Sequence, residues 1–102
     1  YGVTTDLNLT TNNWINAQVI YDGTQATNDA KLKLYIDGVE KTLGYVGTIP
    51  TTIRSISTAG ITMGGNSSIF TSLLLDDVKI YGFPLSSEQV KQDYVGGSVI
   101  FE

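Results

Sequence analysis

The carboxylates of this chain are too scattered for hydrolytic chemistry. Its three glutamates stand far apart, at Glu40, Glu88 and Glu102, with no Glu-x-Asp-x-x-Glu arrangement, whereas glycoside hydrolysis needs two carboxyl groups flanking the scissile bond. Asp76 and Asp77 are adjacent, so in a strand they would point to opposite faces. The chain has no histidine and no cysteine, which excludes serine-histidine catalysis, histidine metal sites and thiolate chemistry. We therefore predict that the chain is not an enzyme.

The aromatic and polar residues of the chain include the side-chain types that a carbohydrate site uses. A sugar ring stacks on a planar aromatic side chain and exchanges hydrogen bonds with nearby carboxylates and amides. Tyr35 and Tyr81 stand opposite the apolar positions of their expected strands, so they are either exposed, or engaged in cross-strand pairs or a subunit interface. Asp22 and Asn66 fall in expected loops, where a sugar site could form. Trp14 heads a strand with apolar residues, which favours packing over stacking on a ligand.

The charge pattern argues against nucleic acid and membrane partners. The chain has 102 residues and a net charge of −4, from ten acidic and six basic residues. The basic residues are dispersed, whereas phosphate binding needs clustered Lys and Arg. No apolar run approaches the length of a membrane span. The length predicts a single domain over residues 1–102, either complete or partial.

The elements that must position these residues are short strands. Helical periodicity is nearly absent before residue 86, and turn signals recur roughly every eight to twelve residues. Asp37-Gly38 is the strongest hairpin signal, and residues 22–30 form a long polar loop. Strands are expected over residues 3–9, 14–21, 31–36, 39–45, 51–57, 61–63 and 70–81, with 98–101 as a terminal candidate. This pattern predicts an antiparallel sandwich or jelly roll.

The segment from Leu75 to Val90 predicts a closing strand, a proline turn and a short helix. The strand alternates between its two faces, and proline ends it because proline cannot donate to a ladder. Ser86 or Ser87 can cap a helix over about residues 87–93. Gly96-Gly97 would end that helix as a glycine C-cap pair.

Four motifs follow one another in a family-specific order. They are Trp14–Gly23 (WINAQVIYDG), Leu34–Gly38 (LYIDG), Ile61–Gly65 (ITMGG) and the closing segment Leu75–Val90. Together they resemble the laminin-G-like, concanavalin A-like lectin and glucanase jelly rolls, although Ile15-Asn16 stand where that family usually has a His-His pair. The resemblance implies an all-β, antiparallel concanavalin A-like β-sandwich with one short C-terminal helix.

The resemblance also implies a metal and a role. In similar folds the aspartate that opens the last strand often binds a structural Ca²⁺ together with main-chain carbonyls of the opening strand, and Asp76 occupies that position. The alternative for Asp76 is a structural carboxylate that accepts main-chain N–H bonds. The family implies an extracellular or cell-surface (or virion-surface) recognition and adhesion module that binds a glycan or another surface polymer without catalysis.

The first half of the family's domain is expected to be missing, because only Tyr1 to Leu9 precede the tryptophan motif. The end of the chain, Val99–Glu102, resembles the opening strand of another unit. Either the chain is a minimised sandwich that stands alone, or a flanking segment or other copies of the chain supply the missing strands. The second case favours a structural subunit of a self-assembling appendage, filament or capsid decoration. Asn8 and Asn66 begin sequences that fit the N-glycosylation pattern. In a chain rich in Asn, Thr and Ser, a chance match is about as frequent as a real site.

Overall fold

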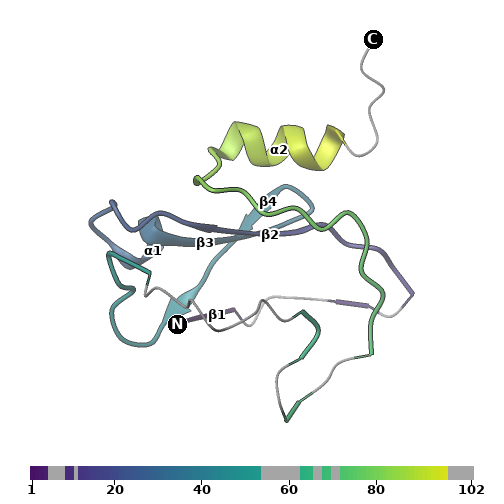
Figure 1. The fold of residues 1–102 in the computed structure, drawn as a ribbon, viewed down its shortest axis with the longest axis horizontal. Helices are drawn as coiled ribbons and strands as arrows, with labels where there is room; N and C mark the ends of the chain where they lie inside the picture. The colour runs from purple at the N-terminus through teal and green to yellow at the C-terminus, as the bar shows by residue number, and fades with distance from the viewer. Residues whose placement is uncertain (5–8, 11, 54–62, 66–67, 70–71, 97–102) are drawn as a thin grey trace.

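Three strands form the main antiparallel sheet of the protein (Figure 1). In the computed structural model, which describes residues 1–4, 9–10, 12–53, 63–65, 68–69 and 72–96, the strands are β2 (Ala17–Tyr21), β3 (Leu32–Ile36) and β4 (Val39–Lys41). They pair in the order β2-β3-β4, so that β2 and β4 are the edge strands of this sheet as the described residues form it. Ala17 lies opposite Ile36 and Tyr21 opposite Leu32, so β2 and β3 pair over their whole length.

The turn between β3 and β4 confirms the predicted Asp-Gly hairpin. Asp37 and Gly38 both have positive φ, at 50° and 77°, as a two-residue type I′ connection requires. The main-chain N–H of Asp37 donates to the carbonyl oxygen of Asn16 at 2.8 Å. The Asp37 carboxylate in turn accepts a hydrogen bond from the N–H of Asn16 at 2.8 Å. The aspartate therefore shapes the turn and also ties it to the residue before β2.

A second, two-stranded antiparallel sheet joins β1 (Gly2–Val3) to β5 (Gly44–Tyr45). The predicted return strand over residues 39–45 is thus divided between two sheets, as β4 and β5. Within the described part of the chain, the structure contains two antiparallel sheets and two short helices. The predicted all-β fold class is confirmed, and neither helix is long or apolar enough to cross a membrane.

The helix α1 (Asn28–Lys31) occupies part of the loop that was predicted to be irregular. Asn28 anchors it to the segment after β5, because its side chain donates to the carbonyl oxygen of Gly47 at 2.9 Å and accepts from the N–H of Ile49 at 2.8 Å. Lys31 is buried, and its Nζ donates to the carbonyl oxygen of Ile49 at 3.0 Å. Polar side chains therefore connect α1 to the segment that follows β5.

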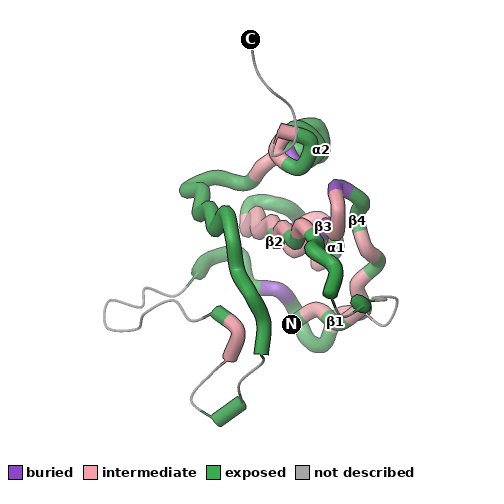
Figure 2. The backbone as a smooth tube through the Cα atoms, turned by 90° about the vertical axis from the view of Figure 1, so that its right-hand side faces the viewer, coloured by how far each residue is buried: buried purple, intermediate pink, exposed green. Residues whose placement is uncertain are grey.

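The helix α2 (Ser87–Gly96) lies over one face of the main sheet (Figures 1 and 2). The Ser86 hydroxyl accepts from the N–H of Gln89 at 3.2 Å, and the Gln89 side-chain oxygen accepts from the N–H of Ser86 at 2.9 Å. This reciprocal capping box confirms the predicted serine cap. Val90 is completely buried, and its carbonyl oxygen accepts from the Gln18 side chain of β2 at 3.2 Å.

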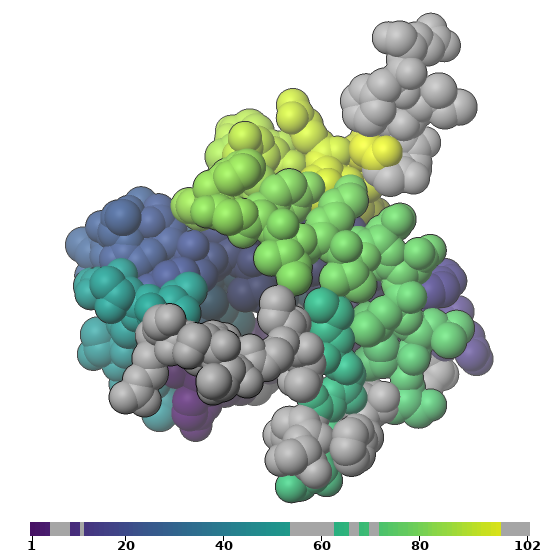
Figure 3. All heavy atoms as spheres, viewed as in Figure 1, coloured from purple at the N-terminus to yellow at the C-terminus, as the bar shows by residue number. Residues whose placement is uncertain are grey.

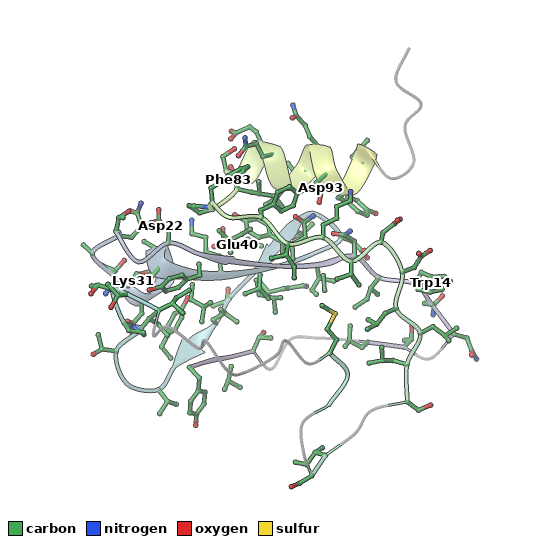
Figure 4. The ribbon with its side chains drawn as sticks, in the orientation of Figure 1. Trp14, Asp22, Lys31, Glu40, Phe83 and Asp93 are labelled. Carbon is green, nitrogen blue, oxygen red and sulfur yellow. The ribbon has the colours of Figure 1, made fainter. Side chains whose placement is uncertain are left out.

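The buried apolar side chains of the described residues are Tyr35, Ile49 and Val90. One of the two alternatives predicted for Tyr35 was an exposed side chain. The structure instead buries it, with only 4% of the residue exposed. It lies directly opposite Gln18, so both side chains are on the face that α2 covers. Trp14 shows the opposite error, because it was predicted to pack and is 67% exposed. The main sheet begins only after this tryptophan, and Figure 4 shows it far from α2.

The prediction of one long strand over residues 70–81 is wrong for its described part. Residues 72–81 form no strand, although part of this segment runs along the outer side of β2. Asp77 has a φ of 51°, which interrupts the extended backbone that a ladder needs. Residues 51–53 form no strand either. The predicted strand residues 5–8, 54–57, 61–62, 70–71 and 98–101 lie outside the described residues.

Candidate functional site

A groove with a volume of about 640 Å³ lies between the outer edge of β2 and the segment of residues 77–85, with α2 at one side. Figure 3 shows the segment before α2, in green, passing directly below the helix. Three aromatic side chains from this segment and from α2 line the groove, namely Tyr81, Phe83 and Tyr94. The groove therefore combines an edge of β2 that no described strand pairs with and a cluster of aromatic rings.

The main chain of β2 faces this groove. Six consecutive residues, Asn16 to Tyr21, line it, although neighbouring side chains of a strand point to opposite faces. The β2–β3 ladder uses the main-chain groups at even-numbered positions of β2. Because the pattern alternates, Ala17, Val19 and Tyr21 direct their N–H and C=O groups towards the groove. Hydrogen-bond donors and acceptors of the backbone are thus available along one wall.

A charged cluster forms where the segment meets α2. Lys79 Nζ and Asp93 Oδ1 are 3.0 Å apart and form an ion pair. The Tyr81 hydroxyl donates to the same oxygen at 3.3 Å. The hydrogen bond that Lys79 donates to Asp93, together with the negative charge of that carboxylate, raises the pKa of the Lys79 ammonium. The three side chains come from two elements, so the cluster fixes the segment against the helix.

The aromatic pair of the groove adjoins this cluster. The ring centroids of Tyr81 and Phe83 are 5.8 Å apart and their planes are tilted by 59°, a favourable arrangement for aromatic rings. Both side chains stay accessible, with Tyr81 44% and Phe83 58% exposed. Figure 4 shows Phe83 beside α2, the helix that carries Asp93. An apolar surface and a charged hydrogen-bonding group therefore stand side by side.

The structure does not bring the predicted carbohydrate residues into one site. Tyr81 lines the groove, whereas Tyr35 lies beneath α2, where burial raises the pKa of its phenol. Asp22 does not line the groove, and its carboxylate accepts hydrogen bonds from Thr24 within its own loop at 2.6 and 3.1 Å. Asn66 lies outside the described residues.

Sequence reasoning missed Lys79, Phe83 and Asp93 as site residues. The signal for Phe83 was present, because it follows Tyr81 at the spacing that places two strand residues on one face. The Lys79–Asp93 pair had no such signal, since the two residues are 14 positions apart and belong to different elements. Their contact depends on how α2 docks, which local patterns do not encode.

Calcium at Asp76 stays a prediction. The Asp76 carboxylate accepts the main-chain N–H of Asp77 at 2.9 Å, as in the alternative of a structural carboxylate. Among the described residues no group of three or more acidic side chains gathers to hold a metal ion. Calcium prefers six to eight oxygen ligands, so the described side chains do not by themselves provide a calcium site.

Antiparallel sheets with one short closing helix define an all-β domain of the sandwich class, with a surface groove beside β2. Over residues 1–91 the chain matches a laminin G family model described as the concanavalin A-like lectin/glucanases superfamily, and it belongs to that superfamily. This match confirms the resemblance that the four sequence motifs carried. No curated protein and no solved structure matched the chain. The superfamily supports a carbohydrate-binding or adhesion-type module in general, and its description names glucanases as well as lectins.

Proposed function

We propose that this chain is a non-catalytic module that binds carbohydrate or a related surface polymer in the groove beside β2. The observation that carries the proposal is the exposed Tyr81–Phe83 pair next to the Lys79–Asp93 ion pair. Sugars present an apolar C–H face and a rim of hydroxyl groups. An aromatic ring covers the first, and charged hydrogen-bonding groups satisfy the second more strongly than neutral ones.

Absence of catalysis is part of the proposal. Glycoside hydrolysis needs two carboxyl groups in defined roles on either side of the scissile bond. Glu40 and Glu88 do not line the groove. Of the two aspartates that do, Asp93 is engaged by Lys79 and by Tyr81. We therefore assign these groups to binding, and we propose an extracellular, cell-surface or virion-surface location for the module.

Retention on immobilised polysaccharides tests the proposal. The wild-type chain should be retained by at least one polymer, and Tyr81→Ala and Phe83→Ala should each weaken retention, by up to about tenfold, because an aromatic contact contributes about 0.5–1.5 kcal/mol. Tyr1→Ala is the matched control, since Tyr1 is exposed and lies outside the groove. Circular dichroism should show that every variant stays folded.

Two further variants separate this groove from other candidate positions. Trp14→Ala tests the exposed tryptophan, and Asp22→Ala tests the loop that the sequence indicated. Loss of retention in either variant, with normal retention of Tyr81→Ala and Phe83→Ala, would move the site away from the groove. Failure of every polymer to retain the folded wild type would overturn the proposal.

The outer edge of β2, which no strand of the described residues pairs with, favours a second candidate function, assembly with other copies or with a flanking segment. An open edge presents main-chain groups on which another strand can form hydrogen bonds. Val19 of β2 and Val39 of β4 are both exposed at the two edges of the main sheet. Self-association in the absence of any glycan, measured as solution mass by light scattering, is the result that this candidate requires.

A further inference from the structure

We infer that the groove selects neutral saccharides carrying adjacent free hydroxyl groups and discriminates against uronates and sulfated sugars. The inference rests on the proposed carbohydrate binding and names the class of ligand. It follows from three features of the groove: its charge balance, the atoms of the ion pair that are left for a ligand, and the angle between the aromatic rings.

The charge balance disfavours anionic sugars. Among the described residues that line the groove, the charged side chains are Asp77, Lys79 and Asp93, which gives one ammonium against two carboxylates. The ammonium of Lys79 is already 3.0 Å from Asp93, so its charge is largely compensated. An anionic sugar would meet the remaining carboxylate of Asp77, and close like charges repel at short range.

The ion pair offers one acceptor and one donor to a ligand. Both hydrogen bonds that described residues donate to Asp93 end on Oδ1, and within this part of the chain Oδ2 is left to accept from a sugar hydroxyl. Lys79 has three N–H donors and uses one of them on Asp93, while its side chain stays about half exposed at 51%. Two neighbouring hydroxyls of one sugar can therefore bind together, one donating to Asp93 and the other accepting from Lys79.

The rings complete this choice of ligand. Tyr81 and Phe83 are tilted by 59°, so the apolar C–H face of a sugar ring can stack on one of them while the rim of the sugar meets the other. Because the Tyr81 hydroxyl also donates to Asp93, the stacking surface is held beside the hydrogen-bonding pair before any ligand arrives. Such preorganisation reduces the entropy cost of binding.

The test compares polymers that differ only in charge. The best-retained neutral polysaccharide and its carboxymethyl derivative are titrated against the full chain in low salt. We expect the neutral polymer to bind about tenfold tighter or more, and the difference to shrink when salt screens the carboxylates. Asp77→Asn should reduce the difference in affinity between the two polymers several-fold, because it should improve binding of the carboxymethyl polymer alone. Asparagine tolerates the positive φ at this position.

Variants of the ion pair test the hydrogen-bonding role. Lys79→Met and Asp93→Asn should each weaken binding of the neutral polymer by about tenfold, the size of one lost charged hydrogen bond. If the carboxymethyl polymer binds as tightly as the neutral polymer or more tightly, and Tyr81→Ala abolishes that binding, the preference for neutral sugars is refuted. Carbohydrate binding in the groove would then remain in place. Binding of neutral polymers that survives both ion-pair variants would refute the proposed hydroxyl contacts. If no polymer binds, the proposed function itself fails.

Discussion

At the scale of single residues, two aspartate carboxylates of this protein have different surroundings. Asp22 organises its own loop, because it accepts hydrogen bonds from the Thr24 hydroxyl, the Thr24 N–H and the Gln25 side chain at 2.6, 3.1 and 2.9 Å. Asp93 instead faces the groove, with one oxygen held by Lys79 and Tyr81. The first carboxylate contributes to stability, and we assign the second to binding.

Asp22 should give the protein a pH-dependent contribution to stability. Its hydrogen bonds, that from the Thr24 hydroxyl first, lower the pKa of the carboxyl from the ordinary value of 3.8. The folded state then binds the proton more weakly than the unfolded state. The contribution is therefore present above pH 3.8 and is lost as the pH falls through the folded pKa. Unfolding of wild type and Asp22→Asn should differ most above pH 5 or so and converge in acid.

Carboxyl titration by NMR checks the same residue directly. The folded pKa of Asp22 should lie below 3.8, and Thr24→Ala should raise it, because the Thr24 hydroxyl makes the largest contribution to the shift. A folded pKa at or above 3.8 in the wild type would contradict this account.

At the scale of elements, the turn between β3 and β4 depends on a glycine that α2 also touches. Gly38 has a φ of 77°, and a Cβ added there would lie 3.0 Å from Cδ1 of Tyr94 on α2. Gly47 has nearly the same φ, 76°, but a Cβ added there meets nothing within 4 Å. The two glycines therefore share one conformational requirement and differ in their packing.

Alanine at each glycine should separate these two effects. Gly47→Ala should cost about 1–2 kcal/mol in the free energy of unfolding, the cost of a left-handed conformation for an L-residue. Gly38→Ala should cost more, because the turn must also move away from Tyr94. Tyr94→Ala should abolish that extra cost in the double variant, as urea unfolding would show. Equal costs for the two single variants would mean that Tyr94 does not press on the turn.

Local elements were predictable where one short motif fixes them. The Asp37-Gly38 turn and the Ser86 cap follow from the conformations and hydrogen bonds that these residues favour, and both are present. The alternation of apolar and polar residues around Val78 also indicated a strand, but residues 72–81 form none. Alternation shows which face of a segment is apolar, and it does not show which strand could pair with it. The positive φ of Asp77 depends on its surroundings and left no signal in the sequence.

For the candidate site, the sequence indicated the types of residue involved but not which of them come together in space. Tyr81 was identified from its residue type and strand position and lines the groove. Tyr35 was identified by the same reasoning and is buried, because the docking of α2 decides which face of the sheet remains accessible. Contacts between distant segments, such as Lys79 with Asp93, arise only from that docking.

Across the whole molecule, much apolar surface of the described residues is accessible, while few apolar side chains are buried. Val19 is 67% exposed on an edge strand. Edge strands with exposed apolar residues tend to pair with other chains unless a charge prevents it. The net charge of −4 opposes association in low salt, and added salt screens this repulsion within about 10 Å at 0.1 M.

Assembly through β2 therefore predicts a mass that rises with both protein concentration and salt. Light scattering of the wild type should exceed the 11.0 kDa of one chain, and Val19→Lys should return to it, because a lysine on an edge strand hinders pairing. Val46→Lys is the matched control, since Val46 is also exposed but lies outside the main sheet. A wild type that stays at the mass of one chain would refute assembly through this edge. The groove beside β2 would then remain open to a glycan, and the retention experiments would decide whether one binds there.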